Sequence, residues 1–256
     1  KKSKLLSQKD FDRAKIAFDQ IKSGKVITGY KTSQKIKDKD FNRFVQWIYL
    51  MKSSNNATFS TYETFIRNNN DFPRISRLRY LAEQKIYLKN SSPKNIIKWF
   101  DDFPPVSGTG KLKLGEAYFD LKNIGIANQL IKEGWITADL NKSSLRYYHK
   151  KFKSILNTED HIKRSDYLAW GKKYWDLKRM LVYLPSDFKA LYNARQILMS
   201  NSYGVDTSIA KVPAHLKKNI GLEYDRLKWR NRRGRLESSL EILYSNGNKS
   251  EDELVR

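Results

Sequence analysis

The sequence predicts an all-helical protein, an array of stacked helical hairpins. Three observations favour this class. Apolar side chains recur at helical spacing along the chain. Only 6 Pro and 12 Gly in 256 residues leave little room for the tight turns of a β-sandwich or barrel. The chain is 39% hydrophobic, with aromatic residues spread along its length, so it can form an extended core.

The first helices are predicted by apolar stripes with polar residues on the other faces. Asp71 and Pro73 precede the third stripe, and Ser92 and Pro93 precede the fourth, as is typical of helix N-termini. The stripes are Phe11–Ala14–Phe18–Ile21, Phe41–Phe44–Val45–Ile48–Met51, Ile75–Leu78–Leu81–Ala82 and Ile96–Ile97–Phe100.

The segment 103–111 interrupts these helices. Pro104 and Pro105 end the preceding helix, and Gly108 and Gly110 predict a loose connection, so a boundary within the array could fall here. Residues 107–111 also have the glycines and lysine of a phosphate-binding loop. They lack the full spacing and a preceding buried strand, which favours an ordinary loop.

Helix pairs are predicted in the second half of the chain. Residues 112–134 contain two short helices joined near Asn123 and Gly125, and similar pairs surround Gly171 and Gly234. Three loose copies of an aromatic helix, a glycine turn and an aliphatic helix suggest a solenoid. We therefore expect one α-helical domain over residues 1–256. Ser250 and Glu253 fit a capping box, which indicates that the chain stops partway through a larger protein.

The composition limits the classes of partner. A net charge of +23 would attract nucleic acid, anionic lipid surfaces or acidic cell-wall polymers. The excess of Lys over Arg and the many Asn residues would equally follow from an AT-rich genome. No stretch approaches the roughly 20 apolar residues needed to span a bilayer. The absence of Cys excludes disulfides, Cys-ligated zinc and thiol nucleophiles, but does not fix the compartment.

The strongest binding signal is the basic segment 228–235. Interleaved Arg and Trp can contact phosphates, carboxylates or sugar faces. The alternative is a solvated helix end, where cations complement the helix dipole. The candidate binding residues are Trp229, Arg230, Arg232, Arg233 and Arg235.

We expect no catalytic site, metal site or cofactor. His149, His161 and His215 do not form a metal-binding spacing, and residues 158–161 resemble the first turn of a helix. The pairs Asp101–Asp102 and Glu159–Asp160 are expected at helix ends.

The order of segments resembles the N-terminal superhelical region of soluble lytic murein transglycosylases, particularly the alphaproteobacterial type. The resemblance covers nearly the whole chain, although each motif is short. It rests on Asn70–Asp71–Phe72–Pro73, Leu78–Arg79 with Ala82–Glu83, Trp99–Phe100–Asp101–Asp102–Phe103–Pro104–Pro105, Gly134–Trp135, Asp160–His161 with Arg164, Asp166–Tyr167–Leu168 with Trp170, Arg179–Met180–Leu181, Ala194–Arg195, Val212–Pro213, Gly221–Leu222, Tyr224–Asp225–Arg226, Trp229–Arg230 and Arg233–Gly234.

This resemblance implies an exported, periplasmic protein whose helices form a right-handed superhelical ring or horseshoe, similar to tetratricopeptide arrays. The catalytic lysozyme-like domain of the family, which cleaves peptidoglycan to 1,6-anhydromuramoyl ends with one Glu, is absent from this chain. Glu237–Ser238 and Tyr192–Asn193–Ala194 partly match its motifs, but they occur in the wrong order and are interpreted as helix surface. No catalytic residue is therefore assigned.

The resulting hypothesis is a helical scaffold that binds or positions peptidoglycan glycan strands, and other cell-wall proteins are further candidate partners. Two alternatives remain. One is a helical repeat that binds nucleic acid through the basic segment, and the other is a protein-interaction scaffold in which the charge is incidental.

Overall fold

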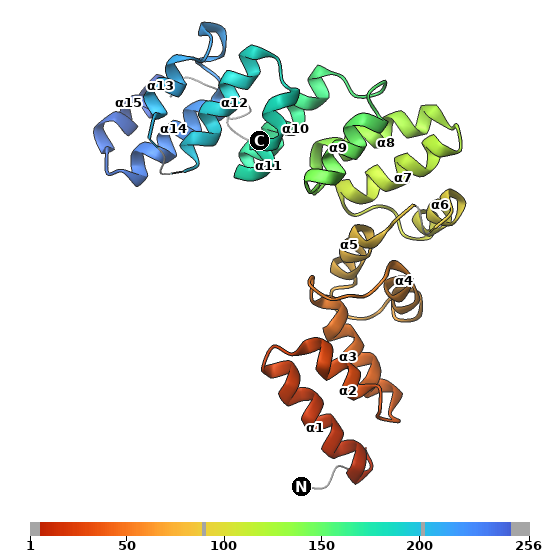
Figure 1. The fold of residues 1–256 in the computed structure, drawn as a ribbon. Helices are drawn as coiled ribbons and strands as arrows, with labels where there is room; N and C mark the ends of the chain where they lie inside the picture. Colours follow the sequence, from red (N-terminus) through yellow and green to blue (C-terminus); the bar gives the residue numbers. More distant parts are fainter. Residues whose placement is uncertain (1–5, 89–90, 201–202, 247–256) are drawn as a thin grey trace. The chain divides into compact units, whose positions relative to one another are not determined.

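The computed structural model describes residues 6–88, 91–200 and 203–246, and the regular structure of these residues is entirely helical (Figure 1). They form 15 α-helices and two short 3-10 helices, which confirms the all-α class. The chain divides into two compact units, Lys1–Val106 and Ser107–Arg256. The division lies inside the segment 103–111.

The first unit contains six helices, and consecutive helices pack together within the pairs α1–α2, α2–α3 and α4–α5. Helix α3 follows the stripe expected from Phe41 to Met51, but its buried residues are Val45, Tyr49 and Leu50, whereas Phe44 is 42% exposed. The helices are α1 (Gln8–Lys22), α2 (Val26–Ser33), α3 (Lys39–Met51), α4 (Phe59–Asn68), α5 (Ile75–Lys85) and α6 (Pro93–Asp102).

Two helix starts in this unit behave differently. Ser92 caps α6 as predicted, because its hydroxyl accepts a hydrogen bond from the Asn95 N–H at 3.3 Å. Neither Asp71 nor Pro73 caps α5. That helix instead begins after Arg74, which has a left-handed backbone and no side-chain cap.

The second unit contains the remaining helices, and the helix pairs expected in residues 112–134, 167–181 and 222–243 are α7–α8, α10–α11 and α14–α15. The helices are α7 (Gly108–Asp120), α8 (Ile124–Thr137), α9 (Lys142–Lys151), α10 (Thr158–Trp170), α11 (Tyr174–Met180), α12 (Ser186–Leu198), α13 (Val205–Ala210), α14 (Ile220–Arg232) and α15 (Leu236–Asn246), with 3-10 turns at Leu181–Tyr183 and Ala214–Leu216.

The loose connection predicted around Gly108 and Gly110 is wrong, since both glycines lie in the first turn of α7. The Ser107 hydroxyl caps this helix by accepting from the Gly110 N–H at 2.9 Å. A Cβ on Gly108 would lie 2.2 Å from the Thr137 Oγ1 atom, and one on Gly134 would lie 2.6 Å from the Leu112 nitrogen. These glycines therefore serve the close packing of α7 on α8 (Figure 1).

Four helix pairs share one turn. In the pairs α1–α2, α7–α8, α10–α11 and α14–α15, a backbone N–H reaches back five residues to a carbonyl oxygen at 2.8 to 3.0 Å. The residue before each donor has a positive φ, as in a Schellman motif. These left-handed residues are Gly24, Lys122, Lys172 and Gly234, with φ values of 82°, 64°, 52° and 69°. At two turns the left-handed residue is thus a lysine, not the glycine expected from the sequence.

The core of the second unit is continuous from α7 to α14. It includes Trp135, Phe152, Leu168, Met180, Leu191 and Trp229. Tyr192 and Ala194 also belong to it, so the expectation that they lie on a helix surface is wrong.

Ser250 and Glu253 lie outside the described residues. Within the described part of the chain, no helix combines the length and apolarity that a membrane span requires.

Candidate functional site

An arginine buried in the second unit connects three helices. Arg195 on α12 is 0% exposed. Its Nη1 donates to Asp166 Oδ1 on α10 at 2.8 Å, and its Nε donates to Asp225 Oδ2 on α14 at 2.7 Å. Its guanidinium carbon lies 5.2 Å from the centre of the Trp170 ring. Two charged hydrogen bonds and a cation–π contact therefore fix Arg195 between α10 and α14.

A glycine allows this arrangement. A Cβ on Gly221, in the first turn of α14, would lie 2.3 Å from the guanidinium carbon of Arg195. Any side chain at this position would collide with the guanidinium. Burial raises the pKa of Asp225, and the adjacent Arg195 opposes that rise.

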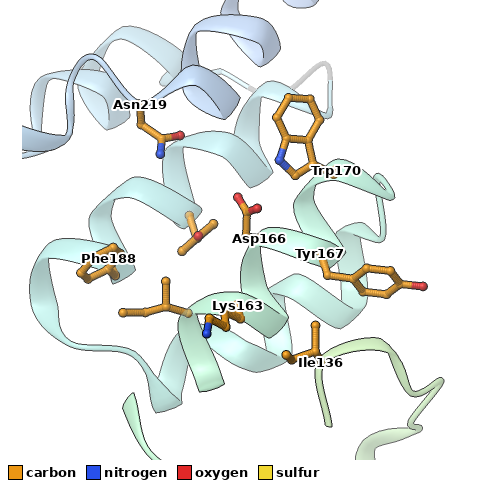
Figure 2. A pocket seen from close by; sticks show the side chains of 9 residues that line it. Ile136, Lys163, Asp166, Tyr167, Trp170, Phe188 and Asn219 are labelled. Carbon is orange, nitrogen blue, oxygen red and sulfur yellow. The ribbon is translucent and has the colours of Figure 1, made fainter. Parts of the chain in front are cut away.

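A cleft of about 580 Å³ opens beside this ion cluster. Helices α8, α10 and α12 supply most of its lining, together with the residue that precedes α14. The lining residues are Ile136, Ile162, Lys163, Asp166, Tyr167, Trp170, Phe188, Tyr192 and Asn219. Figure 2 shows Asp166 in the middle of the lining, with Trp170, Phe188 and Asn219 around it and the Tyr167 ring directed away.

The polar groups of the cleft are held by their neighbours. The Asp166 side chain is 33% exposed, and Arg195 binds one of its two carboxylate oxygens. The Asn219 side-chain oxygen caps α14 by accepting from the Leu222 N–H at 3.1 Å. Burial, strengthened by the Asp166 carboxylate, raises the pKa of Tyr192, so that this phenol keeps its proton at neutral pH.

Lysine 163 is the only cation among the lining residues, and it does not pair with Asp166. Its Nζ lies 2.7 Å from Glu159 Oε1, one helical turn earlier, and this carboxylate raises the pKa of Lys163. The cleft thus combines aromatic and aliphatic walls with one carboxylate, one amide and one lysine at the rim.

The basic segment at 228–235 lies at the end of α14 and in the turn that follows. Trp229 is only 8% exposed, and the Arg233 and Arg235 guanidinium carbons lie 5.5 and 5.1 Å from the centre of its ring. Its indole therefore packs in the core beneath two arginines and is not presented to a ligand.

Two other arginines of the segment bind backbone carbonyl groups. Arg232 donates to the Leu198 oxygen at 2.5 Å, at the C-terminal end of α12, and Arg230 donates to the Ser238 oxygen. Leu198 is the last residue of α12, so Arg232 satisfies a carbonyl that the end of this helix leaves open, whereas Ser238 lies in the first turn of α15. Arg233 and Arg235, whose guanidinium groups lie over the Trp229 ring, are exposed.

Two of the three histidines lie together, His161 buried and His149 half-buried. The ring centres of His149 and His161 are 5.2 Å apart, and that of Tyr183 is 4.1 Å from His149. Burial lowers the pKa of His161 to about 4 and also lowers that of His149, so both rings are neutral at pH 7. Among the described residues, no group of three or more acidic or histidine side chains is arranged to hold a metal ion.

The Arg195 cluster was not predicted as a site, although each of its members lies in a motif quoted above. The cluster unites Asp166, Trp170, Arg195, Gly221 and Asp225. One feature of the sequence could have indicated the cluster. The two aspartates lie about 30 residues before and about 30 residues after the arginine. Such even spacing is typical of contacts between successive hairpins of a repeat.

Comparisons with protein-family models, curated proteins and solved structures give no match to this chain.

Proposed function

We propose that this chain is the helical scaffold region of a lytic murein transglycosylase. In this proposal it is a right-handed solenoid of stacked hairpins in the periplasm. It binds and positions peptidoglycan glycan strands for cleavage to 1,6-anhydromuramoyl products by a C-terminal lysozyme-like domain.

The observation that carries the proposal is the convergence of separate motifs on Arg195. The resemblance rests on short segments scattered over residues 70–234, each of which is weak by itself. Asp166, Gly221 and Asp225 come from three of these segments, and all of them contact the same guanidinium group. This shared contact supports the resemblance, because it gives residues of separate motifs one common structural role.

The solenoid part of the proposal is supported by the shared Schellman turn. A turn that recurs with the same hydrogen bonds in four helix pairs is what a degenerate helical repeat would produce. The net charge of +23 favours an acidic or polyanionic polymer as the partner.

The test is co-sedimentation of the purified chain with insoluble peptidoglycan sacculi, at low and high salt, with duplex DNA as competitor. We expect the chain to pellet with sacculi, less so at high salt because exposed charges are screened over a Debye length of roughly 10 Å at 0.1 M. Soluble anhydromuropeptides should not be released, since the proposed cleavage belongs to another domain.

The other outcomes are equally informative. Release of anhydromuropeptides would contradict a non-catalytic scaffold. Binding of DNA alone, with a steep salt dependence, would replace the proposal with the nucleic-acid alternative that the charge also permits. Binding of neither polymer would leave a protein-interaction scaffold in its place.

A further inference from the structure

We propose that the cleft between α8, α10 and α12 binds an uncharged sugar ring of the N-acetylhexosamine class. The inference rests on the proposed function, in that it names the site where the scaffold would hold a glycan strand. It also makes a separate claim, because a scaffold could bind a strand through exposed cations alone.

The size and walls of the cleft suit a sugar ring. Its volume of about 580 Å³ lies within the usual range for small-ligand sites, roughly 300 to 1,000 Å³. Trp170 and Phe188 are half-buried and supply flat apolar surface, on which the C–H face of a pyranose can pack. Ile136 and Ile162 extend this surface and could receive the methyl of an acetamido group.

The main aromatic wall is fixed before any ligand arrives. Contacts with the Arg195 guanidinium at 5.2 Å and with the Tyr224 ring at 5.2 Å hold the indole of Trp170. A side chain that is already ordered loses little conformational entropy on binding, which favours affinity for a weakly interacting ligand.

The polar groups match hydroxyl and amide chemistry. Asp166 has carboxylate lone pairs beyond those that Arg195 and Tyr192 use, so it can accept from a sugar hydroxyl. The Asn219 side-chain oxygen already accepts a hydrogen bond at the start of α14. Its amide NH₂ group can therefore donate to a ligand oxygen. Arg195 acts here as a positioning residue, because it touches Asp166 and not the ligand.

The charges of the cleft argue against an anionic ligand. A phosphate would meet the Asp166 carboxylate, and Arg195 is shared between Asp166 and Asp225, so its single positive charge cannot neutralise both carboxylates. An uncharged ring avoids this repulsion and still uses the aromatic surface. The cleft therefore favours a neutral saccharide over a nucleotide.

The experiment is isothermal titration calorimetry of the full chain with tetra-N-acetylchitotetraose, a soluble uncharged probe, and in parallel with amidase-released glycan strands. Trp170→Ala is expected to weaken binding by roughly tenfold or more, since truncation of a central Trp anchor commonly has this effect. Trp175→Ala is the matched control. Trp175 lies on α11, is 66% exposed and does not line the cleft, so its loss should leave binding unchanged.

Phe188→Ala provides a second test, because Trp170→Ala also removes the contact between the indole and Arg195. Far-ultraviolet circular dichroism verifies the fold of each variant. Equal affinity in wild type, Trp170→Ala and Phe188→Ala would overturn the cleft assignment, as would failure of the wild type to bind either glycan.

The two proposals fail in different ways. If sacculi pellet the chain but Trp170→Ala and Phe188→Ala leave the affinity for the chitotetraose unchanged, the scaffold function stands and the cleft assignment is wrong. If the chitotetraose binds through Trp170 but sacculi do not pellet the chain, the cleft binds a saccharide and the peptidoglycan function is wrong.

Discussion

At the scale of single residues, the contact between Gly221 and Arg195 explains why α14 can approach α12. The Arg195 guanidinium has no exposed surface, is bound by two carboxylates and lies against a residue without a side chain. Removing one partner of a buried ion pair leaves the other charge uncompensated, which is more costly than never having had the pair. The second unit therefore depends on a glycine for a reason that is electrostatic as well as steric.

We predict that Gly221→Ala lowers the free energy of unfolding by about 1 to 3 kcal/mol, because the new Cβ overlaps the Arg195 guanidinium. Urea denaturation followed by circular dichroism measures the change. The matched control is Gly125→Ala, also in the first turn of a helix, where a Cβ would meet nothing within 4 Å. This control should be neutral or gain up to about 1 kcal/mol from helix propensity. Equal effects at the two positions would contradict the clash.

At the scale of helices and turns, two lysines adopt a backbone conformation that favours glycine. Lys122 and Lys172 have φ values of 64° and 52° at the ends of α7 and α10. A residue with a Cβ in this region costs roughly 1 to 2 kcal/mol, although glycine loses more entropy on folding. The same turn in α1–α2 and α14–α15 uses glycine and avoids this strain.

Lys122→Gly and Lys172→Gly are therefore each expected to raise the free energy of unfolding by about 0.5 to 1 kcal/mol. Lys173→Gly serves as control, because Lys173 has a φ of −83° and its side chain pairs with Asp139. It should give no gain. Chemical denaturation measures the free energy of unfolding of the three variants. A loss of stability in Lys122→Gly equal to that in Lys173→Gly would contradict the claim that the left-handed lysine is strained.

The elements were largely predictable from local pattern, whereas the candidate site was not. Stripes such as Phe11 to Ile21 repeat within one helix, so periodicity alone located them. The local sequence predicts a loop at Gly108, because its helix-packing partner, Thr137, lies 29 residues away and the pattern around the glycine does not record it. Arg195 was missed for a similar reason, since its partners lie on other helices and a single arginine gives no sign that it will be buried.

At the scale of the whole molecule, the chain consists of two compact units, so each should carry its own core. The second unit has one continuous apolar core from Leu112 to Trp229. The first has buried side chains of its own, among them Tyr62, Leu78 and Trp99. Units with separate cores can fold separately.

We expect the fragment 107–256 to fold alone, with helical circular dichroism and one cooperative urea transition. A control fragment ending at residue 157 retains α7 and α8 but lacks α10, which packs on α8. This shorter fragment should not show a cooperative urea transition. Failure of 107–256 to fold would show that the two units depend on each other.

The Arg195 cluster also has a consequence for how such a protein can change during evolution. A replacement of Arg195 leaves the Asp225 carboxylate buried without its cation, and a replacement of Gly221 creates a clash with the guanidinium. Arg195, Asp225 and Gly221 are therefore exchanged at least cost together, for instance for an apolar set of the same volume. Lineages are expected to inherit these positions as one block, while exposed residues at the rim of the cleft, such as Lys163, diverge more freely.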